Sequence, residues 1–545
     1  MIVSRRPYFW TLGVRPWWRS VAVSTVALLT VLAFLTASLA ADQDSKKDED
    51  SQKLERAAAL IQTGKLDEAE GDLWEVLKQH PENATALNLL GSVRLQQKRF
   101  AESESLLSRA TSLAPEFLAA YINLARVFQA QAETDKQIAT LLNAARFAPK
   151  DPEVNSSLAA AYLKKNDYDH ALEALQRIPA SRRPDKALPL LAGCYLGLGS
   201  VEKARGLVPT VMAHGAKNHA LPVEFADVLL DFNLVKDALA VLQTAEKQPP
   251  LSSEFFLAMG RARERTGEPA LAQKNFQRAV ELNPKSVDAM QALARLLAAQ
   301  GKWDKSLELL TRCRAIAPDS PDVLRKFAAT SLHAGRPADA VEAAQQLIKL
   351  RPNETEALYL LGVAQLQNGD AEQSQATLDK YLKLNPADPL GFLALGMALV
   401  NLRDFSSART DFEQCIKLDP NQVDALYELG SISKEQGDAA AAIPYLEKAV
   451  AINPSHGRAQ ALLGQLYLSQ RDYSKAQLHL TRAAELAPNV PDTHYQLGLL
   501  FARLNQHDRA QREMDQFHQL KEKENPGPVP PGSKPASATP PYPPS

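Results

Sequence analysis

The sequence predicts an all-α solenoid, in which about fourteen helix–turn–helix repeats follow one another along the chain. Prolines recur at residues 81, 115 and 149 and again at 250, 284, 318, 352, 386, 420, 454 and 488, and every step within each run is 34 residues. A fixed period of this length is typical of repeats that bury their apolar faces only against their neighbours. With these prolines at position 32, the repeats begin at residues 50, 84, 118, 152, 185, 219, 253, 287, 321, 355, 389, 423, 457 and 491.

Two columns of small residues support this frame. Position 8 is Ala or Gly in all fourteen repeats, and position 20 is small in thirteen, with Gln137 as the exception. The distance between two packed helices depends on the side chains at their contact, so small residues allow a close crossing. We therefore expect the two helices of each repeat to cross at positions 8 and 20.

Three further positions predict where each helix begins and ends. Position 15 is Gly or Asn in ten repeats, and both residues tolerate the left-handed conformation that closes a helix. Proline at position 32 cannot continue the second helix and biases the residue before it away from helix. The Asp, Ser or Thr that often follows is suited to cap the next first helix.

The repeat that begins at residue 253 resembles the tetratricopeptide repeat (TPR). The residues that stand where this family has W, L, G, A, F, A and P are Phe256, Met259, Gly260, Ala272, Phe276, Ala279 and Pro284. The resemblance covers residues 50–522. It implies a right-handed superhelical solenoid in which the first helices line a concave groove and positions 2, 5, 9 and 12 face that groove.

The repeats divide into three expected segments. Repeats 1–4 occupy residues 50–184, and repeats 7–14 occupy residues 253–522. The repeats between them, residues 185–252, are degenerate and hold extra prolines. One of these, Pro209, falls inside a second helix and should break or kink it. We therefore expect a possible joint in this segment.

The two ends of the chain differ from the repeats. Residues 1–40 carry four arginines and no acid, and their second half is an uncharged run of 20 residues. This pattern predicts either a signal peptide cleaved after Ala40 or a retained N-terminal membrane anchor. Both alternatives predict export, to an inner-membrane-anchored form facing the periplasm or to a periplasmic or secreted form. Residues 41–49 form a charged spacer, and the Pro-rich tail, residues 523–545, is expected to be disordered.

Composition argues against several classes of function. The net charge is −1, which gives no reason to expect nucleic acid as a partner. Cys194, Cys313 and Cys415 lie far apart and are expected to be core residues, and His214 and His219 are expected on the surface without a metal. The sequence has no phosphate-binding loop and no G-x-S-x-G motif, so we expect neither a cofactor nor an enzyme.

The predicted partner-binding site is a mostly apolar stripe along the groove. Tyrosine recurs at position 5, and a contiguous apolar surface usually marks a binding site. The nine predicted residues are Leu332, Tyr359, Val363, Leu366, Leu393, Met397, Val400, Tyr427 and Tyr495. Acids at position 2 could form a ligand-binding rim, or they could only favour the helix dipole.

These observations predict a non-catalytic protein–protein interaction scaffold or assembly factor that holds a protein or peptide in the groove. Exported bacterial members of the family often serve envelope assembly, secretion or polysaccharide export. Two alternatives stay open, a soluble periplasmic adaptor and a carbohydrate-binding solenoid. The carboxylate clamp of some relatives is not supported, because Asn88, Ser92 and Asn123 lack the lysine that it needs.

Overall fold

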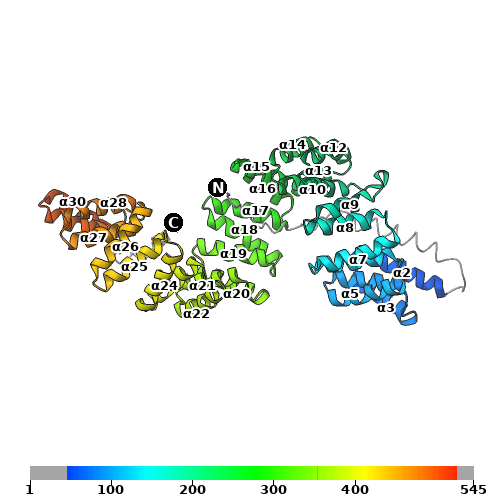
Figure 1. Cartoon of the computed structure of the whole chain (residues 1–545), viewed down its shortest axis with the longest axis horizontal. Coiled ribbons are helices and arrows are strands. Elements are labelled where there is room, and N and C mark those ends of the chain that lie inside the picture. The colour runs from blue at the N-terminus through cyan, green and yellow to red at the C-terminus, as the bar shows by residue number, and fades with distance from the viewer. Residues whose placement is uncertain (1–45, 353, 525–545) are drawn as a thin grey trace, which may run out of the picture. The chain divides into compact units, whose positions relative to one another are not determined.

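A computed structural model describes residues 46–352 and 354–524 of the chain. Within these residues the chain forms helices joined by short turns, and no strand. Successive helices pair in antiparallel fashion, and the pairs follow one another in tandem (Figure 1). The predicted all-α solenoid is therefore confirmed.

The chain forms two compact units, Met1–Asn283 and Pro284–Ser545, here called the N-terminal and C-terminal units. In the N-terminal unit the helices are α2 (Lys46–Gln62), α3 (Leu66–Gln79), α4 (Ala84–Gln96), α5 (Phe100–Leu113), α6 (Leu118–Ala130), α7 (Thr134–Phe147), α8 (Pro152–Lys164), α9 (Tyr168–Gln176), α10 (Ala187–Gly197), α11 (Val201–Arg205), α12 (Val208–Gly215), α13 (Ala220–Asp231), α14 (Val235–Ala245), α15 (Ser253–Arg265) and α16 (Pro269–Leu282), with a 3-10 turn at Ala180–Arg182.

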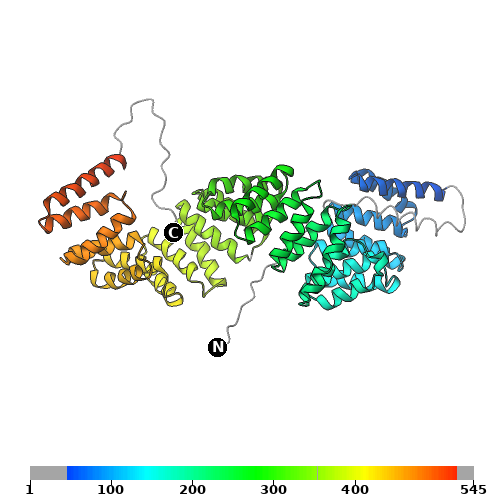
Figure 2. The same cartoon turned by 90° about the horizontal axis from the view of Figure 1, so that it is seen from above.

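The helices of the C-terminal unit pair along its whole described length, and Figure 2 shows the last pair, drawn in red, side by side. They are α17 (Val287–Ala299), α18 (Trp303–Ile316), α19 (Pro321–His333), α20 (Pro337–Leu350), α21 (Thr355–Asn368), α22 (Ala371–Leu384), α23 (Pro389–Asn401), α24 (Phe405–Leu418), α25 (Val423–Glu435), α26 (Ala439–Ile452), α27 (Gly457–Ser469), α28 (Tyr473–Leu486), α29 (Pro491–Arg503) and α30 (His507–Glu524). From α15 onward, every first helix begins at the residue that the proline frame predicts.

The left-handed position predicted at the end of each first helix is present in every repeat. All fourteen residues at position 15 have a positive φ, from Gly64 to Asn505. Four of them are neither Gly nor Asn, namely Lys98, Ala132, Arg403 and Arg471. The repeat geometry therefore imposes this conformation even where the residue type disfavours it.

The small residues at position 8 lie where the two helices of a repeat cross. A Cβ atom on Gly260 would lie 2.5 Å from the ring of Phe276, which is fully buried at position 24. Position 20 is close to the same point, because the Ser306 hydroxyl donates a hydrogen bond of 2.8 Å to the carbonyl oxygen of Ala294. The close crossing predicted from these two columns is confirmed.

The second helix of the repeat at residue 185 is broken. The helix α11 ends at Arg205, and α12 begins at Val208 with Pro209 in its first turn. Proline is tolerated there because the first turn has no intrahelical partner for its missing N–H. The break expected at Pro209 is confirmed, while the possible joint over residues 185–252 stays a prediction.

The predicted leader, residues 1–40, and most of the predicted tail lie outside the described residues. Among residues 46–352 and 354–524, no helix combines the length and the apolar character that a membrane span requires.

Candidate partner-binding surface

Positions 2, 5, 9 and 12 of a repeat lie on one side of its first helix, and we call this side the first-helix face. The helix α23 has an apolar stripe on this face. Leu390, Leu393, Met397 and Val400 are spaced by three, four and three residues, so they lie along one side of the helix. Leu390 is 44% exposed and Met397 is 40% exposed. No residue of α23 carries a charge, so this stripe is apolar from end to end.

The neighbouring helix α21 extends the apolar surface. It packs beside α23 and contributes Tyr359, Val363 and Leu366, which are half-buried. We call these three residues and the four of α23 the α21–α23 patch. Leu332, on the adjacent helix α19, is also half-buried. The structure therefore brings six of the nine predicted site residues together on two adjacent helices, with Leu332 on the next.

Tyr359 is held by packing within its own repeat. Its ring centre lies 5.4 Å from that of Tyr381 on α22, whose hydroxyl donates a hydrogen bond of 2.5 Å to Asp388. Burial, followed by the charge of Asp388, raises the pKa of Tyr359 above its ordinary value. The raised pKa keeps the Tyr359 hydroxyl neutral at physiological pH.

Tyr427, on α25, is covered by side chains at the start of α27. The Arg458 guanidinium lies 4.4 Å from the centre of the Tyr427 ring, and the His456 ring centre lies 5.3 Å away. A cation over the face of a tyrosine ring is attracted by its quadrupole. One face of Tyr427 is therefore already occupied within the chain.

Tyr495, on α29, is the most open of the three tyrosines. It is 37% exposed, and its ring centre lies 5.3 Å from that of Phe517 on α30. Leu499, one turn further along α29, is 38% exposed. Tyr427 and Tyr495 thus belong to later repeats than the α21–α23 patch, and a single site formed by all nine predicted residues stays a prediction.

Two of the acids at position 2, Asp322 and Glu356, form ion pairs with neighbouring side chains. Asp322 accepts a bond of 2.7 Å from Lys326, and Glu356 lies 2.9 Å from Arg325 of the preceding repeat. These acids therefore interact within the chain. Their place in the first helical turn also favours the helix dipole. The structure gives no separate sign of an acidic rim for a ligand.

The asparagines considered for a carboxylate clamp bind each other. The Asn123 amide donates a hydrogen bond of 2.8 Å to the Asn88 side-chain oxygen, and Arg126 donates one of 3.1 Å to Asn123. This pairing links α4 and α6 on the first-helix face of the N-terminal unit.

The three cysteines are buried in the core, as predicted. Cys194, Cys313 and Cys415 are free thiols and are 0% exposed. Burial raises the pKa of Cys194 to about 12 and that of the other two to about 11. The thiols are therefore protonated and inert, since the thiolate is the reactive form.

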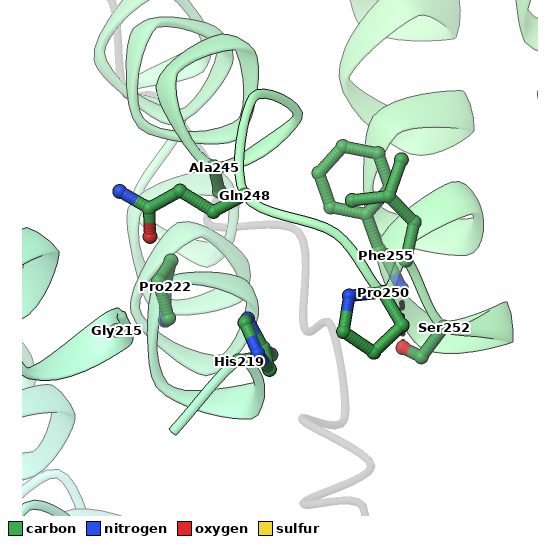
Figure 3. A pocket seen from close by; sticks show the side chains of 9 residues that line it. Gly215, His219, Pro222, Ala245, Gln248, Pro250, Ser252 and Phe255 are labelled. Atoms are coloured by element: carbon green, nitrogen blue, oxygen red, sulfur yellow. Dashed lines mark hydrogen bonds between the residues drawn. The ribbon is translucent and has the colours of Figure 1, made fainter. Parts of the chain in front are cut away.

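The histidines form no metal site in the described part of the chain. His214 and His219 lie on the surface, as predicted, and His214 pairs with Asp185 at 2.7 Å. No group of three His, Cys, Asp or Glu residues that could hold a metal occurs among residues 46–352 and 354–524. A hollow beside His219, lined by Pro222, Pro250 and Phe255 among others (Figure 3), offers about 10 Å³, which suits no more than a water molecule.

Sequence reasoning missed two exposed residues of the first-helix face. Leu390 occupies position 2, which was interpreted only as a column of acids, and Leu499 occupies position 9 of the last repeat. The signal was available, because the same frame places both leucines in columns that face the predicted groove.

Comparison with known proteins agrees with this architecture. Two patterns described as tetratricopeptide repeat match the chain, one over residues 54–116, 393–457 and 461–513 and the other over residues 214–385. The chain is 26% identical over 272 residues to "Cellulose synthase operon protein C" of Xanthomonas axonopodis pv. citri. That alignment covers 47% of this chain and 18% of the relative, so the chain spans under a fifth of that protein.

Two solved structures illustrate the structural likeness. The Cut9–Hcn1 structure is 15% identical, covers 87% of this chain and 99% of its own, and gives a TM-score of 0.40. MamA from Desulfovibrio magneticus is 26% identical over 32% of this chain and 98% of its own, with a TM-score of 0.29. At these scores neither structure informs the function of this chain. The repeat columns and the matched patterns, which together cover more than half of the residues, show that the chain belongs to the tetratricopeptide repeat family.

Proposed function

We propose that the chain is a non-catalytic scaffold that holds an apolar segment of a partner protein on the α21–α23 patch. Tetratricopeptide repeats are interaction modules, and this chain adds a surface suited to that role. The single observation that carries the proposal is the uncharged α23 stripe, in which Leu390 and Met397 are 44% and 40% exposed.

The spacing of the stripe favours a helical partner. The four residues of α23 follow the three–four–three spacing of a coiled-coil seam, in which apolar side chains of one helix insert between those of another. An amphipathic helix in an apolar groove is a common mode of peptide recognition. Burial of a side chain such as Leu or Met contributes about 1.5–3 kcal/mol when it is complete, so a few anchors suffice for a specific contact.

The tyrosine packing favours peptide over carbohydrate. Sugar recognition by stacking needs an open ring face, whereas Arg458 covers one face of Tyr427 and Tyr381 packs against Tyr359. Tyr495 is the most exposed of the three tyrosines, at 37%, and Phe517 packs against its ring. A carbohydrate-binding solenoid is therefore the less supported alternative.

We place this scaffold in the cell envelope, either anchored at residues 20–40 or released after Ala40. The basic, then apolar, N-terminal sequence supports export. The name of the relative, "Cellulose synthase operon protein C", supports a pathway of polysaccharide synthesis or export. Fractionation with and without a carbonate wash distinguishes an anchored scaffold from a soluble periplasmic adaptor.

The test is a pull-down from envelope extract with the wild-type chain and with Met397→Asp. A charge at the centre of the patch would be buried unpaired by an apolar partner, so specific capture should be lost. The matched control is Leu478→Asp on α28, which replaces another leucine that is 66% exposed. A protein captured equally by wild type and Met397→Asp would contradict the proposed site, and circular dichroism checks that both variants remain helical.

A further inference from the structure

The ring of Tyr495 in the last repeat is more exposed than the equivalent ring of Tyr427 in an earlier repeat. Tyr427 and Tyr495 occupy the same position of their repeats, and the repeat that follows Tyr427 places Arg458 over its ring. Within the described residues, no repeat follows α30. Tyr495 is correspondingly 37% exposed.

Neighbouring side chains enlarge this open surface into a patch. Phe517 on α30 lies 5.3 Å from Tyr495, ring centre to ring centre, and His518 lies 5.2 Å from Phe517. Leu499 lies one turn along α29 from Tyr495 and is 38% exposed. We call Tyr495, Leu499, Phe517 and His518 the terminal aromatic patch.

We propose that residues 526–545 of this same chain bind the terminal aromatic patch. This segment holds nine prolines and a single charged residue, Lys534. Aromatic-lined surfaces bind proline-rich segments, because proline presets an extended chain and loses little entropy on binding. The segment also contains Tyr542, whose ring can pack on Tyr495 or Phe517.

The position of the segment in the chain makes the contact feasible. It follows α30 directly, and Phe517 lies seven residues before the end of that helix at Glu524, which is about 10 Å at 1.5 Å per residue. Twenty residues of extended proline-rich chain span roughly 60 Å. The segment can therefore return to the patch, and its attachment gives an effective concentration of about millimolar.

Binding of this segment would regulate one end of the first-helix face. Tyr495 is one of the nine residues predicted to bind a partner, so the segment would compete with a partner that extends from the α21–α23 patch to the last repeat. This consequence rests on the proposed function, whereas the contact itself does not, because the terminal aromatic patch lies on α29 and α30.

The test uses a dye-labelled synthetic peptide of residues 526–545 and fluorescence anisotropy. The peptide is added to the full wild-type chain and to a full chain in which the nine prolines of this segment are replaced by serine. We expect the serine variant to bind the peptide about tenfold more tightly, because its own segment no longer competes. Adding Tyr495→Ala to the serine variant should weaken peptide binding about fivefold through loss of the ring contact.

Two control variants of the serine-substituted chain make the result specific. Leu478→Ala removes an exposed leucine of α28 and should leave peptide binding unchanged. Met397→Asp disrupts the α21–α23 patch and should also leave it unchanged, so that failure of the proposed function and failure of this inference are distinguishable.

Three results would overturn the inference. They are absence of peptide binding, equal binding to the wild-type and serine-variant chains, and binding that Tyr495→Ala does not weaken. Sedimentation velocity tests the competing occupant, a second copy of the chain. A concentration-dependent dimer that Tyr495→Ala abolishes would assign the patch to self-association instead.

Discussion

A Cβ atom on Gly362 of α21 would lie 2.6 Å from the Cγ atom of Leu378 on α22. Leu378 is fully buried, so its side chain fills the space that a larger residue at 362 would need. At the same crossing, the Ser374 hydroxyl donates a hydrogen bond of 2.7 Å to the Gly362 carbonyl oxygen. The side chains of Leu378 and Ser374 thus pack directly on the α21 backbone at Gly362, and a Cβ atom there would require Leu378 to move.

We predict that Gly362→Ala destabilises the α21–α22 pair by about 1–3 kcal/mol, because the added methyl group forces Leu378 to move. Amide hydrogen exchange of the two helices measures this local change, which suits a repeat array better than one global free energy. The control is Gly193→Ala on α10, where the new Cβ would meet Leu163 at an ordinary 3.6 Å. At Gly193, alanine should stabilise the helix. Slower amide exchange of α21 and α22 in Gly362→Ala would contradict the explanation.

A second prediction concerns the left-handed position. Ala132 has φ of 62° and is exposed at the turn between α6 and α7. A left-handed conformation costs an L-residue about 1–2 kcal/mol relative to glycine. Ala132→Gly should therefore slow amide exchange of α6 and α7. The reverse change, Gly301→Ala, should speed exchange of α17 and α18 through backbone strain alone, since no atom lies within 4 Å of the new Cβ.

Most of the fold could be predicted because each position of the repeat obeys a local rule. Proline stops the second helix, a capping side chain starts the next, and the crossing needs a small residue. Even Lys98 and Arg403 adopt the left-handed conformation, because the neighbouring columns determine where the first helix must end.

The candidate site was less predictable, because side-chain packing between repeats leaves no simple pattern. Position 27 of the repeat holds the buried Cys313 and Cys415 in two repeats, yet Tyr381 and Phe517 occupy the same position in others and contact tyrosines. The guanidinium of Arg458, in the following repeat, packs over the ring of Tyr427. Exposure of each tyrosine therefore depends on a residue that lies far from it in sequence.

The buried thiols lead to a third prediction. Cys194, Cys313 and Cys415 are 0% exposed, and burial raises the pKa of each thiol to about 11 or 12. The folded chain should therefore show no rapid reaction with a thiol reagent at mildly alkaline pH, while the unfolded chain reacts at all three. A colorimetric titration that counts the reactive thiols, with and without denaturant, checks this. One fast-reacting thiol in the folded chain would show that its repeat is open.

A fourth prediction concerns the pH dependence of the N-terminal unit. Burial, followed by the charges of Asp227 and Asp185, raises the pKa of Glu224 to about 7 from 4.5. The unfolded chain thus ionises this group at lower pH than the folded chain. Its contribution to stability is complete below pH 4.5 and is lost as the pH rises to about 7.

The melting temperature of Glu224→Gln should therefore fall less than that of wild type as the pH rises from 4.5 to about 7. Nearby charged groups, His214 against Asp185 and Arg261 against Asp227, remain in this variant, so the difference from wild type isolates Glu224. Glu254→Gln, at an exposed position of α15, is the matched control. Parallel pH profiles of wild type and Glu224→Gln would show that Glu224 is ionised in the folded chain at neutral pH.

The last prediction separates the apolar patch from the acidic residues as the source of partner affinity. The α21–α23 patch has no charge on α23, so affinity for its partner should change little between low and high salt, because screening acts only on charged contacts. Leu390→Ala and Met397→Ala should each weaken binding about fivefold or more, since each truncation removes apolar area that the partner would bury. Glu356→Gln, which removes an exposed acid already paired with Arg325, should have little effect. Titration of the captured partner at two salt concentrations measures all three variants. A steep loss of affinity with salt, together with a strong effect of Glu356→Gln, would instead assign recognition to the position-2 acids, because rim charges act through long-range attraction that salt screens.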